Sequence, residues 1–418
     1  MIIKKVDIWH LKCKFQYPFK HKLATHAGSD NLVVRLTTDQ GIYGYGEGIP
    51  RGFVTGESLA ASFSCLHQTL GPALRQLPPL SPDNLFASLS GLREKFAVAA
   101  CPGAFCALET ALLDAAGCTW EKSLTELLGT RPLDRVTYSA VVPLSAGPRM
   151  SRFFQLIKSQ GLRYVKLKVG EDNDHETLSQ ARRELGQDVD LRVDANAAWS
   201  ASEAIARLRE LAPFRLSAVE QPVAKEDFEG LRQVQEAVDL PGMADESLCT
   251  LADAAELIRL QACQMFNIRL SKVGGLTAAL RIKQAADAAG IRCQLGCHVG
   301  ETSILAAAGR HFALAHGPFA YLEGCYAPYL LTRDPVAESV RFGQGGVGFG
   351  GQPDDPVGGV ADDGAGRKRD RAVGAGPGEG DHVSGLHPRH RDRPRLDPFD
   401  PGKPHLRADP DDLHGREP

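Results

Sequence analysis

The segment "YVKLKVG", residues 164–170, carries two lysines inside an apolar run with the composition of a buried β-strand. Strand side chains alternate between two faces, so Lys166 and Lys168 point to the same side. Two ammonium groups on one partly buried face repel each other and resist the loss of water. Groups that compensate this charge therefore have to come from elsewhere in the chain.

Acidic residues recur at regular distances after this pair. The apolar runs "LRVDAN", "SAVEQP" and "GMADES" end near Asp194, Glu220 and Asp245, and "FNIRLSKVGG" then supplies Lys272. Counted from Lys168, the successive steps are 26, 26, 25 and 27 residues, which matches one strand, one helix and two short loops. In a (β/α)₈ barrel, the carboxyl ends of all strands meet at one rim, so the period predicts that these five residues form one cluster.

Three converging carboxylates repel one another unless a cation lies between them, and carboxylate oxygens suit Mg²⁺. The alternative is that each acid only caps the helix that follows its strand. A metal ion together with lysines suits the removal of a proton α to a carboxylate. The metal and Lys166 would hold the enediolate charge while another lysine moves the proton.

The chain divides into three zones of different texture. Residues 1–130 begin with alternating segments, "NLVVRLTT" and "GIYGYGEG", which are joined by a turn at Asp39-Gln40-Gly41, and continue into helical sequence such as "CALETALLDAAG". Residues 135–345 alternate apolar runs with amphipathic segments such as "SASEAIARLREL", a βα rhythm that predicts a parallel sheet or barrel. Residues 346–418 are rich in Gly, Pro, Asp and Arg, and we expect a disordered tail there.

Composition excludes several classes of function. The 418-residue chain has a formal net charge of -3, which does not favour binding to nucleic acid. No apolar run approaches the ~18 residues of a membrane span, and the N-terminus lacks the apolar region of a signal peptide. We therefore expect a cytoplasmic protein that acts on a small molecule, without a nucleic-acid or membrane partner.

The five motifs together resemble the enolase superfamily, specifically its muconate-lactonizing subgroup. The matching motifs are Lys166-Leu-Lys168, Asp194-Ala-Asn196, Glu220-Gln-Pro222, Asp245-Glu-Ser247 and Lys272-Val-Gly-Gly275. The resemblance implies a (β/α)₇β modified TIM barrel with an α+β N-terminal capping domain. It also implies Mg²⁺, with Mn²⁺ as an alternative ion, held by Asp194, Glu220 and Asp245. Lys168 and Lys272 would then lie on opposite faces of a carboxylate substrate, and the protein would form a homo-oligomer.

Further residues follow from the same resemblance. Glu301, after the seventh strand, stands where related enzymes place an acid that contacts substrate. Asn196 and Glu246 would orient the metal ligands or the lysines. Two loops of the capping domain would select the substrate, and their candidate residues are His21, His26, Arg51 and Thr55.

The predicted function is an isomerase, either a muconate cycloisomerase-like enzyme or a racemase or epimerase. A lyase on the same scaffold, such as an o-succinylbenzoate synthase or an acid dehydratase, remains an alternative. Dipeptide epimerases of the subgroup carry D-x-D near the last strand, where this chain has Glu323-Gly-Cys325. The family's G-P-G-L-G-like ending is also replaced by the tail, which suggests a shifted reading frame and adds a truncated, inactive paralogue as a third alternative.

Overall fold

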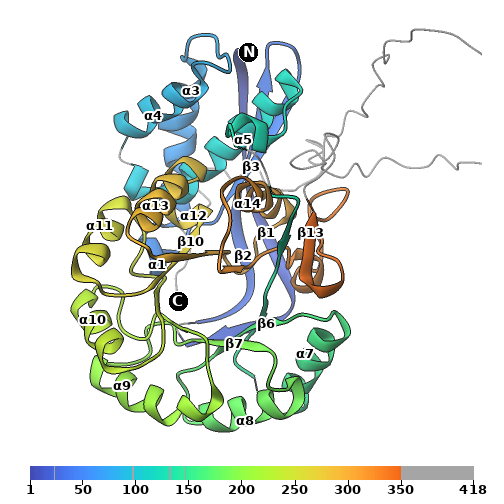
Figure 1. The fold of residues 1–418 in the computed structure, drawn as a ribbon. Coiled ribbons are helices and arrows are strands. Elements are labelled where there is room, and N and C mark those ends of the chain that lie inside the picture. The colour runs from blue at the N-terminus through green and yellow to red at the C-terminus, as the bar shows by residue number, and fades with distance from the viewer. Residues whose placement is uncertain (23, 97, 131–132, 146, 350–418) are drawn as a thin grey trace, which may run out of the picture.

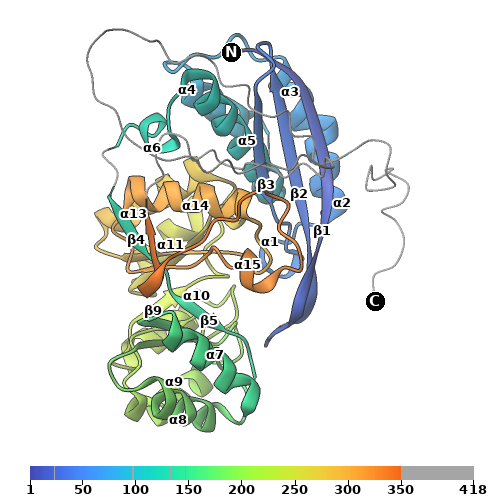
Figure 2. The same cartoon turned by 90° about the vertical axis from the view of Figure 1, so that its right-hand side faces the viewer.

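The computed structural model describes residues 1–22, 24–96, 98–130, 133–145 and 147–349. Within these residues the chain forms an α+β cap and a parallel barrel (Figure 1). The two parts are stacked, and the long strands of the cap run down to the mouth of the barrel (Figure 2). The predicted arrangement of a cap over a barrel is therefore confirmed.

The cap is a three-stranded antiparallel sheet with helices on one side. Its strands, in sheet order, are β1 (Ile3–His21), β2 (Ala24–Thr38) and β3 (Tyr43–Gly48). Its helical segments are α1 (Gly52–Thr55), α2 (Leu59–Ser64), η1 (Cys65–Leu70), α3 (Gly71–Arg75), α4 (Leu85–Lys95), η2 (Val98–Ala100), α5 (Pro102–Trp120) and α6 (Leu124–Leu127). The predicted hairpin is present, because Gly41 N donates to Thr38 O at the turn between β2 and β3.

Helix α5 lies directly on strand β3, which explains the glycines of "GYGEG". A Cβ atom at Gly44, Gly46 or Gly48 would collide with backbone atoms of α5. Glycine therefore permits a close helix–strand approach at every second position of the strand. The motif has a packing role here and does not open a nucleotide-binding turn.

The barrel has eight parallel strands and seven intervening barrel helices in the described part of the chain. The strands are β5 (Ala140–Val142), β6 (Tyr164–Lys168), β7 (Asp190–Asp194), β8 (Val219–Glu220), β9 (Gly242–Ala244), β10 (Met265–Arg269), β11 (Arg292–Gly296) and β12 (Tyr321–Leu322). The helices between them are α7 (Pro148–Ser159), α8 (Asp174–Leu185), α9 (Ala201–Glu210), α10 (Phe228–Ala237), α11 (Leu251–Leu260), α13 (Leu276–Ala288) and α14 (Ser303–His316), with short segments η3 (Ala212–Phe214), α12 (Leu270–Val273) and α15 (Ala327–Leu330). A backbone hydrogen bond from Ser139 N to Leu322 O, of 2.7 Å, joins the two ends of the sheet. This is the predicted (β/α)₇β barrel.

The described chain continues beyond the predicted start of the tail. After η4 (Gln344–Gly346), strand β13 (Val347–Phe349) pairs antiparallel with β4 (Arg135–Thr137). The predicted boundary at residue 346 is therefore too early, because a glycine-rich segment can pair through its backbone without supplying core side chains. The rest of the predicted tail, residues 350–418, lies outside the described residues.

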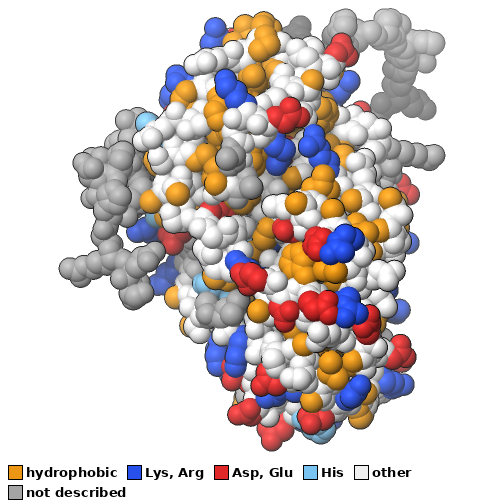
Figure 3. All heavy atoms as spheres, turned by 90° about the vertical axis from the view of Figure 1, so that its left-hand side faces the viewer, with side chains coloured by type: hydrophobic (Ala, Val, Ile, Leu, Met, Phe, Trp, Pro, Cys, Tyr) orange, Lys and Arg blue, Asp and Glu red, His pale blue; other side chains and the backbone are white. Residues whose placement is uncertain are grey.

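The face in Figure 3 carries acidic and basic side chains interspersed with each other. No helix in the described ranges is both long enough and apolar enough to cross a bilayer.

Buried polar groups join the cap to the barrel. The carboxylate of Glu47, on β3, accepts hydrogen bonds from Thr302 N, Thr302 Oγ1 and Leu305 N at the start of α14. Asn31 Nδ2 donates to the same carboxylate at 2.6 Å. Burial nevertheless raises the pKa of Glu47 to about 7, since desolvation outweighs these donors.

This raised pKa predicts a pH dependence of stability. The folded protein holds the proton of Glu47 more tightly than the unfolded chain does, because the pKa of this carboxyl is about 7 in the fold and near 4.5 in the unfolded chain. The protonated carboxyl therefore contributes its full stabilisation below pH 4.5, and this contribution is lost as the pH rises to about 7. The loss is on the order of 3 kcal/mol, from about 1.4 kcal/mol per pKa unit. We expect Glu47→Gln to have a lower free energy of unfolding and a shallower fall between pH 4.5 and 7, as measured by urea unfolding. An identical slope in the variant would contradict the role of Glu47.

Candidate active site

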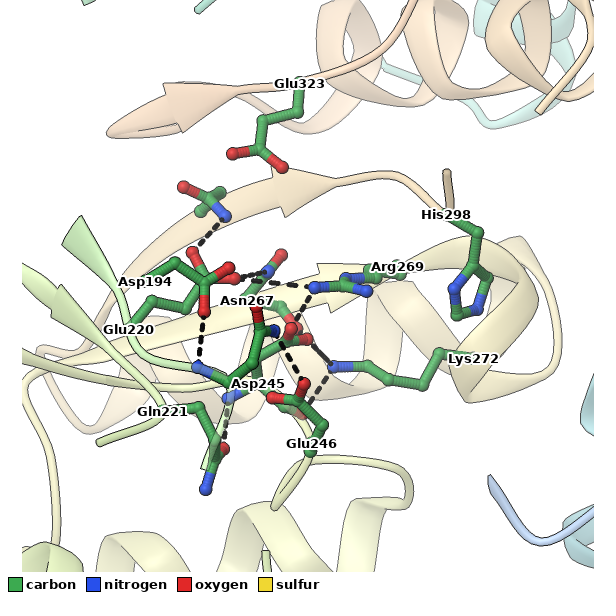
Figure 4. Close-up of polar contacts among 12 residues, drawn as sticks. Asp194, Glu220, Gln221, Asp245, Glu246, Asn267, Arg269, Lys272, His298 and Glu323 are labelled. Carbon is green, nitrogen blue, oxygen red and sulfur yellow. Dashed lines mark hydrogen bonds and ion pairs between the residues drawn. The ribbon is translucent and has the colours of Figure 1, made fainter. Parts of the chain in front are cut away.

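The three predicted carboxylates meet at the carboxyl-terminal rim of the barrel. Asp194 ends β7, Glu220 ends β8, and Asp245 follows β9 directly. The parallel register pairs Lys168 with Asp194 and Asp194 with Glu220, which sets these side chains in a row. All three acids are 0% exposed, and Figure 4 shows them gathered around the same centre.

None of these acids caps the helix that follows it. Helix α9 is capped by Ser200, α10 by Asp227 and α11 by Thr250, each through a side-chain oxygen that accepts from the first turn. The alternative of simple helix caps is therefore wrong, because each helix has its own cap farther along the loop.

Lys166 and Lys168 point from β6 toward the carboxylates. Lys166 Nζ lies 2.9 Å from Glu220 Oε2, 2.8 Å from Glu323 Oε1 and 3.4 Å from Asp194 Oδ2. Desolvation opposes the charge of Lys166, but the three carboxylates outweigh it and raise its pKa. These carboxylates therefore favour the charged form of Lys166. Lys168 Nζ instead donates to Asp194 Oδ2 at 2.6 Å and to Asn196 Oδ1 at 2.8 Å.

Lys272 does not lie where the sequence predicted. It belongs to the single turn α12, its side chain is fully buried, and it does not line the cavity. Its ammonium donates to Asp245 O, Asp245 Oδ1 and Asn267 O at 2.6–2.8 Å, which uses all three protons. We interpret Lys272 as a residue that holds the backbone and carboxylate of Asp245.

Arg269, the last residue of β10, lines the cavity instead. Its Nη2 atom contacts Asp245 Oδ2 and lies 3.5 Å from Glu220 Oε1. The sequence contained a clue to this arrangement. In "FNIRLSK", Asn267 and Arg269 share one strand face, whereas Lys272 has the parity of the apolar residues Ile268 and Leu270.

A layer of polar side chains that the sequence analysis missed supports the carboxylates from inside the barrel. Asn267 Nδ2 donates to Glu220 Oε1 at 2.8 Å, and Gln294 Nε2 donates to Glu220 Oε2 at 3.1 Å. The fully buried Arg192 donates to Gln294 Oε1 at 3.0 Å and to Glu323 Oε1 at 2.7 Å. Glu220 is therefore held from both sides, and Glu323 belongs to this network.

Asn196 and Glu246 lie beside Lys168 at the cavity wall. Asn196 Nδ2 donates to Glu246 Oε1 at 3.0 Å, so that Asn196 links Lys168 to Glu246. Burial and the nearby Asp245 raise the pKa of Glu246 to about 7. Its other oxygen, Oε2, is buried without a hydrogen-bond partner. This chain of contacts fits the predicted orienting role.

The cap loops place their predicted residues over the barrel mouth. His21 and His26 line the cavity with Phe53, and their Nε2 atoms are 3.1 Å apart. Desolvation lowers the pKa of His21 to about 3 and that of His26 to about 4, so both rings are neutral at pH 7. Arg51 also lines the cavity, and its Nη2 donates to Val299 O at 2.5 Å.

Two predicted residues lie outside the cavity lining. Thr55 Oγ1 donates to Glu57 Oε1 at 3.0 Å, within the cap. Glu301 Oε1 accepts from His298 N at 2.6 Å, and burial raises the pKa of Glu301 to about 8. His298 lines the cavity whereas Glu301 does not, so Glu301 holds the loop that carries His298.

The donor set fits a hard divalent ion, although the acids do not form a preassembled metal cage. Among the described residues, no group of three Asp, Glu, His or Cys side chains is arranged to hold a metal. Cations bridge the acids instead, since Lys166 lies between Asp194 and Glu220, and Arg269 contacts Glu220 and Asp245. Each neighbouring pair of carboxylates can therefore share one cation. Three buried carboxylate ligands are of the type that Mg²⁺ prefers.

This fold and rim define a class of protein, namely barrel enzymes with a substrate-covering cap. Residues 3–129 match the family model "Mandelate racemase / muconate lactonizing enzyme, N-terminal domain", and residues 149–356 match "Enolase C-terminal domain-like". The chain belongs to the mandelate racemase/muconate lactonizing group of the enolase superfamily, as its motifs predicted.

The chain is similar to several isomerases. The chain is 33% identical to the hydrophobic dipeptide epimerase of Enterococcus faecalis over 75% of this chain and 88% of the relative. It is 30% identical to muconate cycloisomerase 1 of Pseudomonas putida over 77% of this chain and 86% of the relative. The crystal structure of the E. faecalis dipeptide epimerase with Mg and L-Leu-L-Tyr superposes with a TM-score of 0.78 at 30% identity, covering 86% of this chain and 100% of that one. The predicted enzyme class, an isomerase, is confirmed.

If the three carboxylates are metal ligands, replacing any one of them should weaken metal binding. We expect Asp194→Asn, Glu220→Gln and Asp245→Asn each to weaken Mg²⁺ or Mn²⁺ binding at least tenfold in calorimetry, because a neutral amide is a poorer ligand for a hard cation. The isosteric changes avoid leaving a large cavity beside the buried cations. Asp172→Asn, which removes a fully exposed carboxylate, serves as the control and should bind metal normally. Unchanged affinity in any of the three site variants would remove that residue from the ligand set.

Proposed function

We propose that this protein is a Mg²⁺-dependent isomerase, with Mn²⁺ as an alternative ion, that transfers a proton on one face of a small carboxylate substrate. Cycloisomerisation of the muconate type is the isomerase reaction that this site supports best. The proposal rests on the two cationic residues that we place on opposite sides of the cavity. One of them is a lysine, Lys168, and the other is an arginine, Arg269.

Their positions in the barrel support an opposed arrangement. Lys168 ends β6 and Arg269 ends β10, four strands apart in an eight-stranded sheet whose ends are joined. Residues four strands apart lie on opposite sides of such a barrel. Both side chains line the cavity, so a substrate between them would present one face to each.

The two groups have different proton chemistry. A lysine ammonium can lose and regain a proton, whereas an arginine guanidinium stays protonated in proteins. Inversion by two opposed bases requires that both groups exchange protons. This site has one such group, Lys168, so it favours addition and removal of a proton on a single face.

The remaining residues have supporting roles in this scheme. Bound Mg²⁺ would supply positive charge to the substrate carboxylate as the α-carbon loses its proton. Lys166 contacts Asp194 and Glu220, and Arg269 contacts Glu220 and Asp245, so both cations add positive charge beside the proposed metal ligands. Asn196, held by Glu246, accepts a hydrogen bond from Lys168 and so positions its ammonium.

Epimerisation is the second candidate, because the similarity to dipeptide epimerases is at least as strong as that to the cycloisomerase. It requires a second route for protonation at the face of Arg269. A lyase that uses Lys168 alone remains chemically compatible with the cavity. In each case we expect a small carboxylate substrate, a cytoplasmic location and a homo-oligomeric enzyme.

Lys168 and Lys272 should differ sharply when they are replaced. We expect Lys168→Gln to slow solvent exchange of the substrate α-proton by about 10²–10⁴-fold, the usual contribution of a general base. Lys272→Gln should lower the melting temperature yet retain exchange at saturating Mg²⁺, because its ammonium contacts only protein acceptors. Deuterium incorporation in D₂O, measured on a panel of muconates, N-acyl amino acids and dipeptides, checks both. Normal exchange in Lys168→Gln, or its loss in a folded Lys272→Gln, would reverse the assignment.

Replacement of Arg269 tests the one-face mechanism. We expect the wild-type protein to exchange the α-proton of a chiral substrate with retention of configuration. Arg269→Lys introduces a group that can exchange protons on the other face, so inversion should rise at least tenfold relative to exchange. Arg269→Met removes the charge without adding a base and serves as the matched control. Rapid inversion by the wild-type protein would favour epimerisation.

A further inference from the structure

The active-site cavity extends well beyond the groups that the proposed chemistry needs. It has a volume of about 130 Å³ and contains both Lys166 and Lys168 in its lining. From this polar end it continues into a region that we call the apolar arm. The arm is lined by Phe19, Val141, Phe153, Leu156, Ile157, Leu162, Tyr329, Leu330 and Phe342.

The arm lies at the seam of the barrel. Its walls come from β5, from α7 and the turn after it, and from α15, which follows β12. In the described chain, α15 has four residues and stands where a complete (β/α)₈ barrel would have an eighth long helix. Phe19 of β1 and Phe342 also line the cavity on this side.

The chemistry of the arm differs from that of the rim. Among the lining residues of α7 and the turn after it, Gln160 is the only one with a polar side chain. None of the lining residues between 141 and 162 is charged. Tyr329 and Phe342 stack with ring centroids 5.6 Å apart. Phe19, Leu330 and Phe342 are buried, while Leu156 is 43% exposed and marks the solvent end. Such a surface favours an apolar group over a charged or strongly hydrated one.

We propose that the apolar arm binds an extended aliphatic or aromatic substituent of the carboxylate substrate. This inference rests on the proposed function, because the carboxylate end of the same molecule would lie at Lys166 and Lys168. Continuity with the catalytic cavity assigns the arm to substrate. The protein is therefore specific for carboxylates with a bulky hydrophobic group, and α7 contributes to that specificity together with the cap loops.

The test uses N-acetyl-, N-hexanoyl- and N-decanoyl-L-alanine as probes of rising chain length. Their affinities for the full chain with Mg²⁺ are measured by isothermal titration calorimetry, so turnover is not required. Each methylene that enters the arm should tighten binding by up to about fourfold. We expect the hexanoyl probe to bind at least tenfold more tightly than the acetyl probe, and the decanoyl probe more tightly again.

A matched pair of variants tests whether the acyl chain of the probe lies in the apolar arm. Leu156→Glu places a carboxylate at the solvent end of the arm, whereas Leu251→Glu changes a leucine of similar exposure, 46%, on α11 outside the cavity lining. Both leucines are half-exposed, so both variants should fold. We expect Leu156→Glu to lower the affinity for the decanoyl probe at least fivefold and to leave the affinity for the acetyl probe unchanged. Leu251→Glu should bind both probes with the affinities of the wild-type protein.

Other occupants of the arm give different outcomes. Affinity that does not depend on chain length overturns the proposal, as it would if residues 350–418 or a second copy of the chain filled the arm. Chain-length dependence that Leu156→Glu leaves unchanged also overturns it, because the acyl chain then binds elsewhere. Exchange of the α-proton in D₂O is scored separately on the same probes. A failure of exchange alone counts against the proposed function and leaves the calorimetric result to decide on the arm.

Discussion

Charge balance in the dry centre of the barrel is the constraint on which the site depends. The acids Asp194, Glu220, Asp245 and Glu323 are all buried, and an isolated buried carboxylate is costly because it loses its water. The cations that face them are Lys166, Lys168, Arg192, Arg269 and Lys272. Because several of these cations contact more than one acid, the pairs form one network whose members hold each other in place. Removing one partner therefore affects the position of the others as well as the local charge.

The fold and most of the site could be predicted because they depend on two regular features. These are the repeat length of the βα units and the register of the parallel strands. A step of about 26 residues fixes one chemical residue per βα unit, and parallel pairing then brings Lys168, Asp194 and Glu220 together without any knowledge of their contacts. Strand alternation correctly placed Lys166 and Lys168 on one buried face. These rules act over short distances in the chain, so a single sequence contains them.

The rest depended on contacts that a period does not encode. At the sixth barrel strand the chain leaves β10 at Arg269 and makes one helical turn, α12, which moves Lys272 away from the cavity. A spacing argument cannot distinguish two cationic residues three positions apart, although strand parity can. The support from Arg192 and Gln294 was missed because both are isolated polar residues inside apolar strands. Their roles follow from each other and from Glu220 only once the barrel closes.

The separate helix caps have a consequence for how such a protein can change over time. Ser200, Asp227 and Thr250 start their helices without help from the rim acids. The loops between strand ends and helix starts therefore separate two tasks: the outer part secures the helix, and the inner part carries the chemistry. A substitution at the inner part, such as arginine for lysine at the end of a strand, can alter the reaction while the barrel continues to fold. Variation in catalysis on this scaffold is thus buffered from variation in stability.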